Sequence, residues 1–304
     1  MNMKIGVVVV TYNRIEELKK SLACYEEQTK KPEYIIVVDN CSTDGTDAFL
    51  KIWQSEQGVC NRIVISLNKN MGGAGGFYHG MEMAQDMECA DWVWVADDDA
   101  FPEKNAMEMA EQFSKKHPDI MNEAAALCGM CEYEGRIASV QRIRLVKTLL
   151  GVQEIPAKKS DFSKEYFDID LYSFVGTMIR REVIKKAGLP RKDFFIYQDD
   201  LEHAFRVGKY GRIICIPSVL IHHKDNYLYG DDVTWRDYYA TRNVILMYQE
   251  HLDKKSTWLR GFRRILSAYS SFNQKKIKVI KEAVKDGKNG KTGIHPVYKP
   301  GWKA

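Results

Sequence analysis

The sequence has no hydrophobic run long enough to cross a bilayer and no recognisable export signal. No stretch of the 304 residues approaches the roughly 18 apolar side chains of a membrane span. The apolar run at residues 5–10 is short, and polar residues follow it where a small-residue cleavage site would stand. We therefore expect a chain that neither spans a membrane nor carries a signal peptide.

The cysteines form neither a disulfide framework nor a zinc motif. There are seven, scattered along the chain, and this odd, dispersed set predicts reduced thiols in a cytoplasmic protein. Cys128 and Cys131 form a lone Cys-x-x-Cys, whereas a structural zinc site needs a second pair of ligands. We expect ordinary thiols at these positions.

Charge is distributed unevenly along the chain. The net charge is +4, with 45% hydrophobic and 28% charged residues, a composition typical of a folded globular protein. From residue 251 onward there are fourteen Lys or Arg and three Asp or Glu, so the first 250 residues carry a net negative charge. The two regions are expected to meet different partners.

Strand-like runs and helical periodicity alternate along the first two hundred residues. The runs that predict strands are 4–10, 34–38, 62–67, 92–96, 124–130, 137–140, 174–179, 194–197 and 212–221. The segments with helical periodicity are 14–28, 44–57, 75–86, 102–117 and 199–207. Residues 141–170 give no clear pattern, and the chain turns helical and basic after residue 235, with a flexible break expected at 287–291.

This alternation predicts an α/β fold with a mainly parallel, Rossmann-like central sheet covered by helices on both faces. We expect one catalytic domain at residues 1–235 and a basic, mainly helical extension at 236–304. Ligands of such sheets bind beyond the carboxyl ends of the strands. Polar clusters follow three of the predicted strands, at residues 11–14, 39–40 and 97–99.

Three consecutive carboxylates end the fourth predicted strand: Asp97, Asp98 and Asp99. Because side chains alternate along a strand, Asp97 and Asp99 are expected to share one face. Two carboxylates near a crevice attract Mg²⁺ or Mn²⁺, which proteins commonly hold with one or two carboxylates plus substrate phosphates. The alternative is a solvated connection with helix-capping aspartates, but adjacent like charges repel unless a cation or donor offsets them.

Four motifs, each after one of the first four strands, together resemble the family-2 inverting glycosyltransferases of GT-A fold. They are Thr11-Tyr12-Asn13-Arg14, Val37-Val38-Asp39-Asn40, Asn68-Lys69-Asn70-Met71-Gly72-Gly73 and Asp97-Asp98-Asp99. The glycine-rich segment 72–77 and the acidic segment 195–202 look most like bacterial galactofuranosyltransferases, with rhamnosyltransferases close behind. The resemblance covers about residues 4–243 and implies a nucleotide-sugar-binding domain.

The resemblance implies roles for the residues at these strand ends. Thr11 and Asp39 would hold the nucleotide base and ribose. Asp97 would contact the ribose or diphosphate, and Asp99 would bind the metal. We place Asp98 among the donor-binding residues as well.

The glycine-rich segment 72–76 precedes a predicted helix. Missing side chains let backbone N–H groups approach a diphosphate or sugar, and a helix N-terminus favours anions, so Gly73 is a donor-binding candidate. The spacing does not match Gly-x-Gly-x-x-Gly and the segment follows the third strand, which argues against NAD. The alternative is a glycine-rich turn without a ligand.

A second acidic pair, Asp199-Asp200, opens the helix predicted at 199–207. An inverting transfer needs a base for the proton of the acceptor hydroxyl, and the resemblance gives that role to Asp200, with Asp199 and Glu202 positioning acceptor or sugar hydroxyls. The alternative is helix capping, which needs only one acid.

Two further candidates lie downstream. Of His222 and His223, which follow a late strand, the family pattern selects His223 as a metal ligand, and an imidazole ligand favours Mn²⁺ over Mg²⁺. The alternative is a surface or hydrogen-bonded histidine pair. The segment 235–243 also resembles the family, in which Arg242 would bind the donor diphosphate. A helix-surface arginine is the competing reading.

Aromatic and aliphatic residues interleave with Lys and Arg at helical spacing over residues 254–291. Such a stretch can lie on an anionic membrane surface, where a glycan or lipid-linked glycan acceptor would be met. The alternative is helices packed on the catalytic domain or on a second copy in a homo-oligomer. Nucleic-acid binding is not expected, because no recognition motif appears.

The sequence thus predicts a metal-dependent inverting glycosyltransferase, cytoplasmic and peripheral to the membrane. Its best donor is UDP-galactofuranose, with transfer to a hydroxyl of a growing cell-surface glycan. The alternatives are a rhamnosyltransferase that uses dTDP-rhamnose and a nucleotide-sugar-binding protein without turnover.

Overall fold

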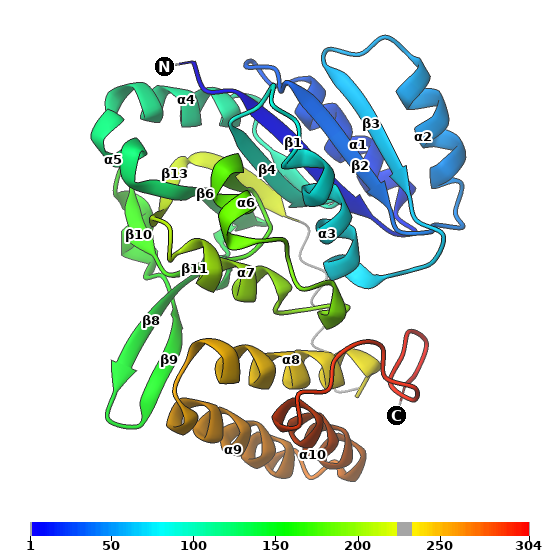
Figure 1. Cartoon of the computed structure of the whole chain (residues 1–304), viewed down its shortest axis with the longest axis vertical. Coiled ribbons are helices and arrows are strands. Elements are labelled where there is room, and N and C mark those ends of the chain that lie inside the picture. Colours follow the sequence, from blue (N-terminus) through cyan, green and yellow to red (C-terminus); the bar gives the residue numbers. More distant parts are fainter. Residues whose placement is uncertain (1, 224–232, 304) are drawn as a thin grey trace.

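A computed structural model describes residues 2–223 and 233–303 of the chain. Its centre is a ten-stranded sheet with the main order β10-β13-β6-β12-β4-β1-β2-β3, in which β5 also pairs with β13 and β7 with β6 (Figure 1). A small sheet has the order β11-β8-β9. The strands are β1 Ile5–Thr11, β2 Tyr34–Asp39, β3 Asn61–Ser66, β4 Trp92–Asp97, β5 Ala100–Pro102, β6 Ala124–Tyr133, β7 Arg136–Ile137, β8 Arg142–Thr148, β9 Gly151–Pro156, β10 Phe167–Ile169, β11 Leu171–Tyr172, β12 Thr177–Arg180 and β13 Arg212–His223.

The predicted mainly parallel sheet is confirmed. β1 runs parallel to β2 and β4, β2 to β3, and β6 to β13. The antiparallel strand β12 joins the two parallel groups by pairing with β4 and β6. All seven residues of β1 are buried, as expected for a strand covered on both faces.

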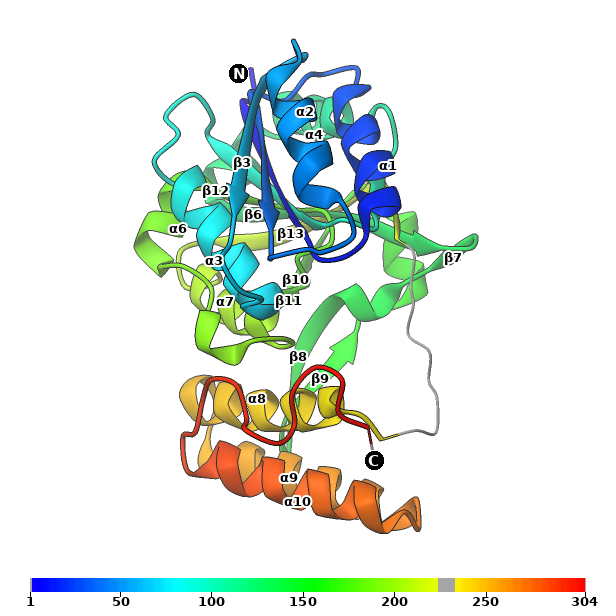
Figure 2. The ribbon, with the colours of Figure 1, turned by 90° about the vertical axis from the view of Figure 1, so that its right-hand side faces the viewer.

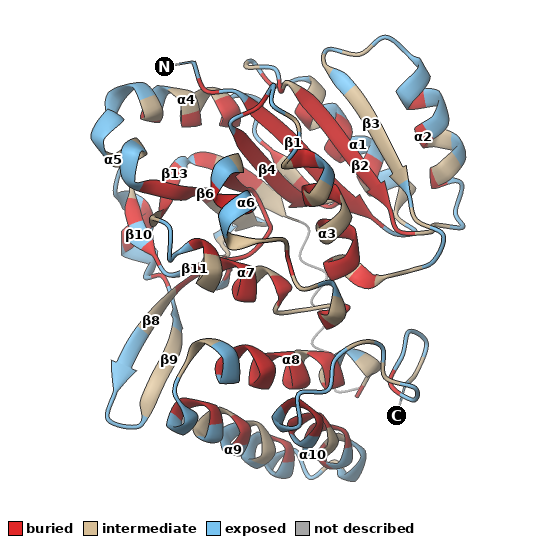
Figure 3. Ribbon diagram, viewed as in Figure 1, coloured by how far each residue is buried: buried red, intermediate tan, exposed pale blue. Residues whose placement is uncertain are grey.

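Helices cover both faces of the sheet (Figure 2). They are α1 Ile15–Glu26, α2 Thr46–Ser55, α3 Gly72–Ala84, α4 Ala106–Lys116, α5 Pro118–Glu123, α6 Arg181–Ala187, α7 Asp199–Val207, α8 Trp235–His251, α9 Lys254–Ser270 and α10 Gln274–Lys288. Val7 and Val9 of β1 share a hydrophobic cluster with α1, α2 and α4, whereas Val8 and Val10 share one with α3, α6 and α7. Because side chains alternate along β1, this strand contributes residues to two buried hydrophobic layers. Buried residues are coloured red in Figure 3.

The last three helices pack beneath the sheet. α8 begins at Trp235, where the catalytic domain was predicted to end, and α9 and α10 lie on its far side from the sheet (Figures 1 and 2). Val244 of α8 and Ile280 of α10 belong to the same hydrophobic cluster as Val8 of β1, so the core continues into these helices. Among the described residues, no helix combines the length and apolarity needed to cross a bilayer.

Three sequence-based assignments differ from the structure. Pro102, where a helix was predicted to open, is the last residue of β5, because residues 100–102 pair with the end of β13. The helix α4 begins at Ala106. Residues 139–141 form a short 3-10 helix rather than the end of a strand. Residues 194–197, predicted to be extended, contain two residues with left-handed backbone, Phe195 and Tyr197.

Candidate active site

The carboxyl ends of β1, β2 and β4 lie side by side at one edge of the sheet. Thr11 pairs with Asp39 across β1 and β2, and Val10 pairs with Asp97 across β1 and β4. Thr11 and Asp39 are both buried. The structure thus brings together the residues that the sequence assigned to the nucleotide end of the donor.

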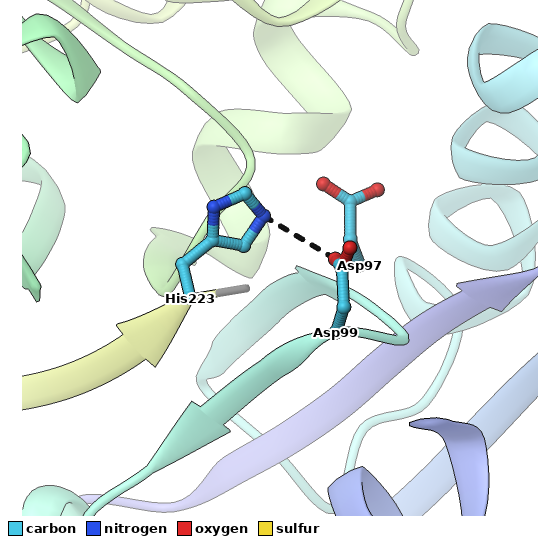
Figure 4. Close-up of side chains that lie close together, drawn as sticks. All are labelled: Asp97, Asp99 and His223. Atoms are coloured by element: carbon cyan, nitrogen blue, oxygen red, sulfur yellow. Dashed lines mark ion pairs between the residues drawn. The ribbon is translucent and has the colours of Figure 1, made fainter. Parts of the chain in front are cut away.

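The short strand β5 brings a histidine to the acidic triplet. Asp98 and Asp99 form a turn after β4, and β5 then pairs antiparallel with β13, so that His223 lies opposite Ala100. Nε2 of His223 lies 3.2 Å from Oδ1 of Asp99 (Figure 4). His222 contacts Glu103 instead, with 2.6 Å between Nε2 and Oε1. Of the two histidines, His223 is the one beside the triplet.

Asp97, Asp99 and His223 form a group that fits a divalent cation. One possible ligand atom from each lies within 4.8 Å of the others (Figure 4). Burial, and next the charge of Asp99, raise the pKa of Asp97 to about 7. Burial opposes ionisation of Asp99 too, but His223 and Arg14 outweigh it and lower its pKa. Carboxylates and imidazoles are common ligands of divalent cations, and Asp97 joins the two ligand candidates named from the sequence.

Arg14 contacts the acidic triplet, although no role was predicted for it from the sequence. Its Nη1 lies 2.6 Å from Oδ2 of Asp99 and 3.2 Å from Oδ1 of Asp98. The other oxygen of Asp98 accepts a hydrogen bond of 2.6 Å from the Thr11 hydroxyl. Burial raises the pKa of Asp98 to about 6 although Arg14 and Thr11 oppose the shift. Asp98 therefore connects Thr11 of β1 with Arg14, which in turn contacts Asp99.

The glycine-rich segment opens α3 and has two structural environments. A Cβ added to Gly73 would meet no atom within 4 Å, so its backbone is open to a ligand. A Cβ at Gly76 would lie 2.3 Å from Cγ1 of Val10, so this glycine lets α3 pack against β1. Nδ2 of Asn40, at the end of β2, donates to the carbonyl of Gly72 at 2.8 Å. Gly73 therefore leaves space beside the backbone, whereas Gly76 allows α3 to pack closely on β1.

Asp199 and Asp200 are the first residues of α7. Burial, and next the charge of Asp200, raise the pKa of Asp199 well above its ordinary range, and the charge of Asp97 contributes as well. The second acidic pair is therefore within electrostatic range of the first. Burial also raises the pKa of Asp200 to about 6, although its Oδ1 accepts a hydrogen bond from the Leu201 N–H at 2.7 Å. The N-cap residue of α7 is Gln198, which makes no side-chain capping hydrogen bond, so the capping alternative does not describe this pair.

The carboxylate of Glu202 contacts protein side chains, whereas it was expected to contact acceptor or sugar hydroxyls. Its side chain is fully buried, and Arg206 donates to both of its oxygens, at 2.8 and 2.7 Å. His251 of α8 lies 2.9 Å from Oε1. The carboxylate thus joins α7 to α8, and these contacts favour a structural role for Glu202 over the predicted positioning of hydroxyls.

Arg242 also differs from its predicted position on the donor diphosphate. It is 1% exposed, and each guanidinium nitrogen donates to a protein oxygen. Nε contacts Oδ1 of Asn243 at 2.9 Å, Nη1 the carbonyl of Gly293 at 2.6 Å, and Nη2 the carbonyl of Phe194 at 3.2 Å. The arginine therefore fastens α8 to two loops, and its burial rules out the helix-surface alternative.

Comparison with known proteins identifies relatives with transferase names. Galactofuranosyltransferase GlfT1 of Mycolicibacterium smegmatis is 30% identical over 198 residues, which are 65% of this chain and 63% of that protein. The protein of the same name from Mycobacterium tuberculosis is 29% identical over 233 residues, covering 73% of this chain and 71% of the relative. The chain thus spans somewhat less than two thirds of the first of these relatives.

Solved structures with the same fold confirm the predicted GT-A architecture. S. aureus TarS in complex with UDP superposes with a TM-score of 0.57 at 18% identity, covering 85% of this chain and 69% of that one. GalNAc-T7 with UDP, GalNAc and Mn²⁺ superposes with a TM-score of 0.63 at 13% identity, covering 94% of this chain and 56% of that one. Mannosyltransferase PcManGT from Pyrobaculum calidifontis, in complex with GDP-Man and Mn²⁺, superposes with a TM-score of 0.58 at 16% identity, covering 97% of this chain and 77% of that one.

The strand ends described above lie within the residues that match a family model. That match runs over residues 6–188 and so includes Thr11, Asp39, Gly73 and the triplet 97–99. It covers more than half of the 304 residues. The chain therefore belongs to glycosyl transferase family 2.

Proposed function

We propose that this chain is a metal-dependent inverting glycosyltransferase that moves galactofuranose from UDP-galactofuranose to a hydroxyl of a growing cell-surface glycan. The observation that carries the proposal is the grouping of Asp97, Asp99 and His223 at the carboxyl ends of the strands. The charge of Asp97 also acts on Asp199 of the second acidic pair. The similarity to galactofuranosyltransferases supports the donor sugar. dTDP-rhamnose is the second candidate donor.

Asp200 is the proposed general base. It accepts the proton of the acceptor hydroxyl as the hydroxyl oxygen attacks the anomeric carbon from the face opposite the diphosphate. The bond from that carbon to the diphosphate oxygen breaks, and the departing diphosphate keeps the electron pair. A pKa of about 6 leaves Asp200 ionised at neutral pH and still basic enough to take a proton. Asp199, whose pKa is raised by burial and by the charge of Asp200, positions acceptor or sugar hydroxyls.

The donor lies along the carboxyl ends of the strands in this proposal. Thr11 and Asp39 hold the nucleoside, and the open backbone at Gly73 faces the diphosphate or sugar. Asp99, His223 and Asp97 would hold a divalent cation, Mn²⁺ or Mg²⁺, which would supply positive charge near the leaving diphosphate. The acceptor is a glycan or a lipid-linked glycan, reached at the cytoplasmic membrane surface through residues 254–291.

The test is release of nucleotide from UDP-, dTDP- and GDP-sugars with Mn²⁺ and an acceptor extract. We expect UDP-galactofuranose turnover that needs Mn²⁺, lost in Asp99→Ala and in Asp200→Asn, while Asp200→Asn still binds donor in calorimetry. Asp86→Asn, at a side chain 77% exposed, is the matched control and should behave as wild type. If only dTDP-rhamnose is turned over, it replaces UDP-galactofuranose as the proposed donor. If a donor binds but no nucleotide is released when acceptor is added, the chain is a binding protein. If no nucleotide-sugar binds, the transferase proposal is refuted.

A further inference from the structure

Four large side chains form an exposed row on α9, which we call the α9 stripe. They are Trp258, Phe262, Leu266 and Tyr269, with exposed fractions of 58%, 48%, 56% and 49%. Their spacing of four, four and three residues places them on one side of the helix. A different side of the helix, with Gly261 and Ala268, is buried. The stripe is therefore an apolar surface beyond what the packing of α9 requires.

The tip of the β8–β9 hairpin extends this surface. Leu149 and Leu150 are 94% and 55% exposed. The ammonium group of Lys255 donates to the carbonyl of Leu149, and Ser256 Oγ accepts from the N–H of Val152 at 2.8 Å. The tip therefore lies beside the first turn of α9 (Figure 1). These leucines fall outside the basic stretch 254–291, and no sequence pattern connects them with it.

A row of lysines borders the stripe. Apart from Gln274, every exposed residue of α10 is a lysine: Lys275, Lys278, Lys281, Lys285 and Lys288. Nζ of Lys281 lies 6.0 Å from the ring centre of Tyr269, so the row adjoins the stripe. The two acids of α10 are engaged, since Glu282 accepts from the Tyr298 hydroxyl at 2.7 Å and Asp286 pairs with Lys291 at 2.8 Å. No exposed residue of α9 or α10, both fully described, carries a carboxylate.

We propose that the α9 stripe, the hairpin tip and the lysine row together dock on an anionic lipid surface. Aromatic and aliphatic side chains enter the interfacial region while lysines meet the head groups. A symmetric contact with a second copy would bring like-charged rows together, which opposes dimerisation. The inference deepens the proposed membrane association and is independent of the transfer chemistry.

Sedimentation with phosphatidylcholine vesicles, with and without phosphatidylglycerol, tests this surface. The full chain should bind only the anionic vesicles, and less as salt rises. Trp258→Ser with Phe262→Ser should weaken binding by about tenfold per aromatic. Lys278→Gln, Lys281→Gln and Lys285→Gln together should weaken it on the order of a hundredfold, at about fivefold per charge. Ile52→Ser, at a 60% exposed residue of α2, is the matched control.

The outcomes separate this surface from the proposed transferase activity. Nucleotide release with a soluble acceptor should be the same in the stripe and lysine variants as in wild type. Absence of binding to anionic vesicles, or binding that neither variant changes, would overturn the docking surface. A concentration-dependent dimer that the stripe variants abolish would replace the lipid with a second copy.

A separate observation concerns the loop 194–198, which leads directly into Asp199 and Asp200. Phe195, Tyr197 and Gln198 have φ values of 69°, 65° and 68°, a left-handed conformation that is unfavourable for residues with a Cβ. Such conformations persist only where the surroundings enforce them, and they concentrate at functional sites. The loop therefore needs partners outside itself.

Asn243 of α8 supplies those partners. It is completely buried, and its Nδ2 lies 3.0 Å from the carbonyl oxygen of Phe194, 2.8 Å from that of Ile196 and 2.9 Å from that of Tyr197. On the other side of the loop, the carbonyl of Phe195 accepts from the N–H of Ala74 at 3.2 Å. The loop is thus fixed between α8 and the glycine-rich start of α3.

We infer that Asn243 is a positioning residue for the acidic pair, a role that rests on the proposed base function of Asp200. Asn243→Asp keeps the shape but turns a carboxylate towards three carbonyl oxygens, and Asn243→Ala removes the donor. Both substitutions should lower kcat at least tenfold. A looser loop should also leave Asp200 better solvated, which lowers the pKa of its carboxyl and moves the acid limb of the pH profile of kcat to lower pH. Mn²⁺ affinity should stay unchanged, because the candidate cation ligands lie on other elements.

Ile280→Ala is the matched control, since it removes a buried side chain of α10 that makes no hydrogen bond to the loop. It should lower Tm without moving the acid limb. If Ile280→Ala and Asn243→Ala have the same kcat and pH profile while both remain folded, the positioning role is refuted. Amide hydrogen exchange of residues 194–201 gives a readout without turnover: faster exchange in Asn243→Ala is expected, and an unchanged rate would refute the role even if no donor is found.

Discussion

Asp200→Asn is expected to stabilise the protein at neutral pH while it removes turnover. The pKa of this carboxyl rises from 3.8 to about 6 on folding, mainly through burial. At about 1.4 kcal/mol per pH unit, this corresponds to about 3 kcal/mol against the ionised carboxylate in the folded chain. Because the side chain is only partly buried by surface area, we expect about 1–3 kcal/mol. Asparagine keeps the oxygen that accepts from Leu201 and has no charge to desolvate.

The direction of the pH dependence follows from the raised folded pKa. Below the unfolded pKa near 3.8 the carboxyl is protonated in both states and makes no difference to the free energy of unfolding. As pH rises through the folded pKa of about 6, the wild type loses stability relative to Asp200→Asn. Urea unfolding at pH 7.5 and at the lowest pH where both proteins stay folded measures this gain, which should shrink on acidification.

The activity of the same protein gives the second half of the test. Wild-type kcat should fall as pH drops through about 6 and the base is protonated, and Asp200→Asn should show no such limb above a strongly reduced background. Equal stability of the two proteins at pH 7.5, or a gain that does not depend on pH, would refute the burial argument. Retained turnover in Asp200→Asn would refute the role as base.

Three further outcomes follow from the site. Gly73→Ala should leave the fold intact and weaken donor binding in calorimetry, whereas Gly76→Ala, whose Cβ would overlap Val10, should destabilise the fold by about 1–3 kcal/mol; the reverse pattern would contradict the assignment of the two glycines. Asp99→Ala should abolish Mn²⁺ binding measured without donor, and tight residual binding would exclude this carboxylate as a ligand. Arg14→Gln should bind Mn²⁺ about tenfold more tightly, because it removes a positive charge beside the carboxylates; weaker binding would show that Arg14 organises the ligands.

The fold of the first hundred residues could be predicted because local pattern and tertiary environment agree there. Strands buried on both faces read as continuous apolar runs, and β1 and β2 are of this kind. The β8–β9 hairpin gave no such pattern because it stands away from the core and exposes Leu149 and Leu150. Residues 194–197 were assigned wrongly because their backbone depends on Asn243, about fifty residues further along the chain.

The site was predictable where strand ends alone determine it. Asp97 and Asp99 could be joined in advance because they end and follow one strand, whereas His223 was selected by the family resemblance. Arg14 was given no role, and Arg242 was assigned to the donor diphosphate without knowledge of its contacts, because the direction of a long side chain is decided by its neighbours. Arg14 reaches the triplet across the turn after β1, and Arg242 is held by carbonyl groups of two distant loops.

The pairing of β5 with β13 has a consequence for biosynthesis. Asp99 emerges from the ribosome more than a hundred residues before His223, and the two meet only when a three-residue strand finds the end of β13. Contacts between such distant parts of a chain form late in folding. A partly made or partly folded chain therefore lacks the complete set of candidate cation ligands, which is assembled only when β5 pairs with β13.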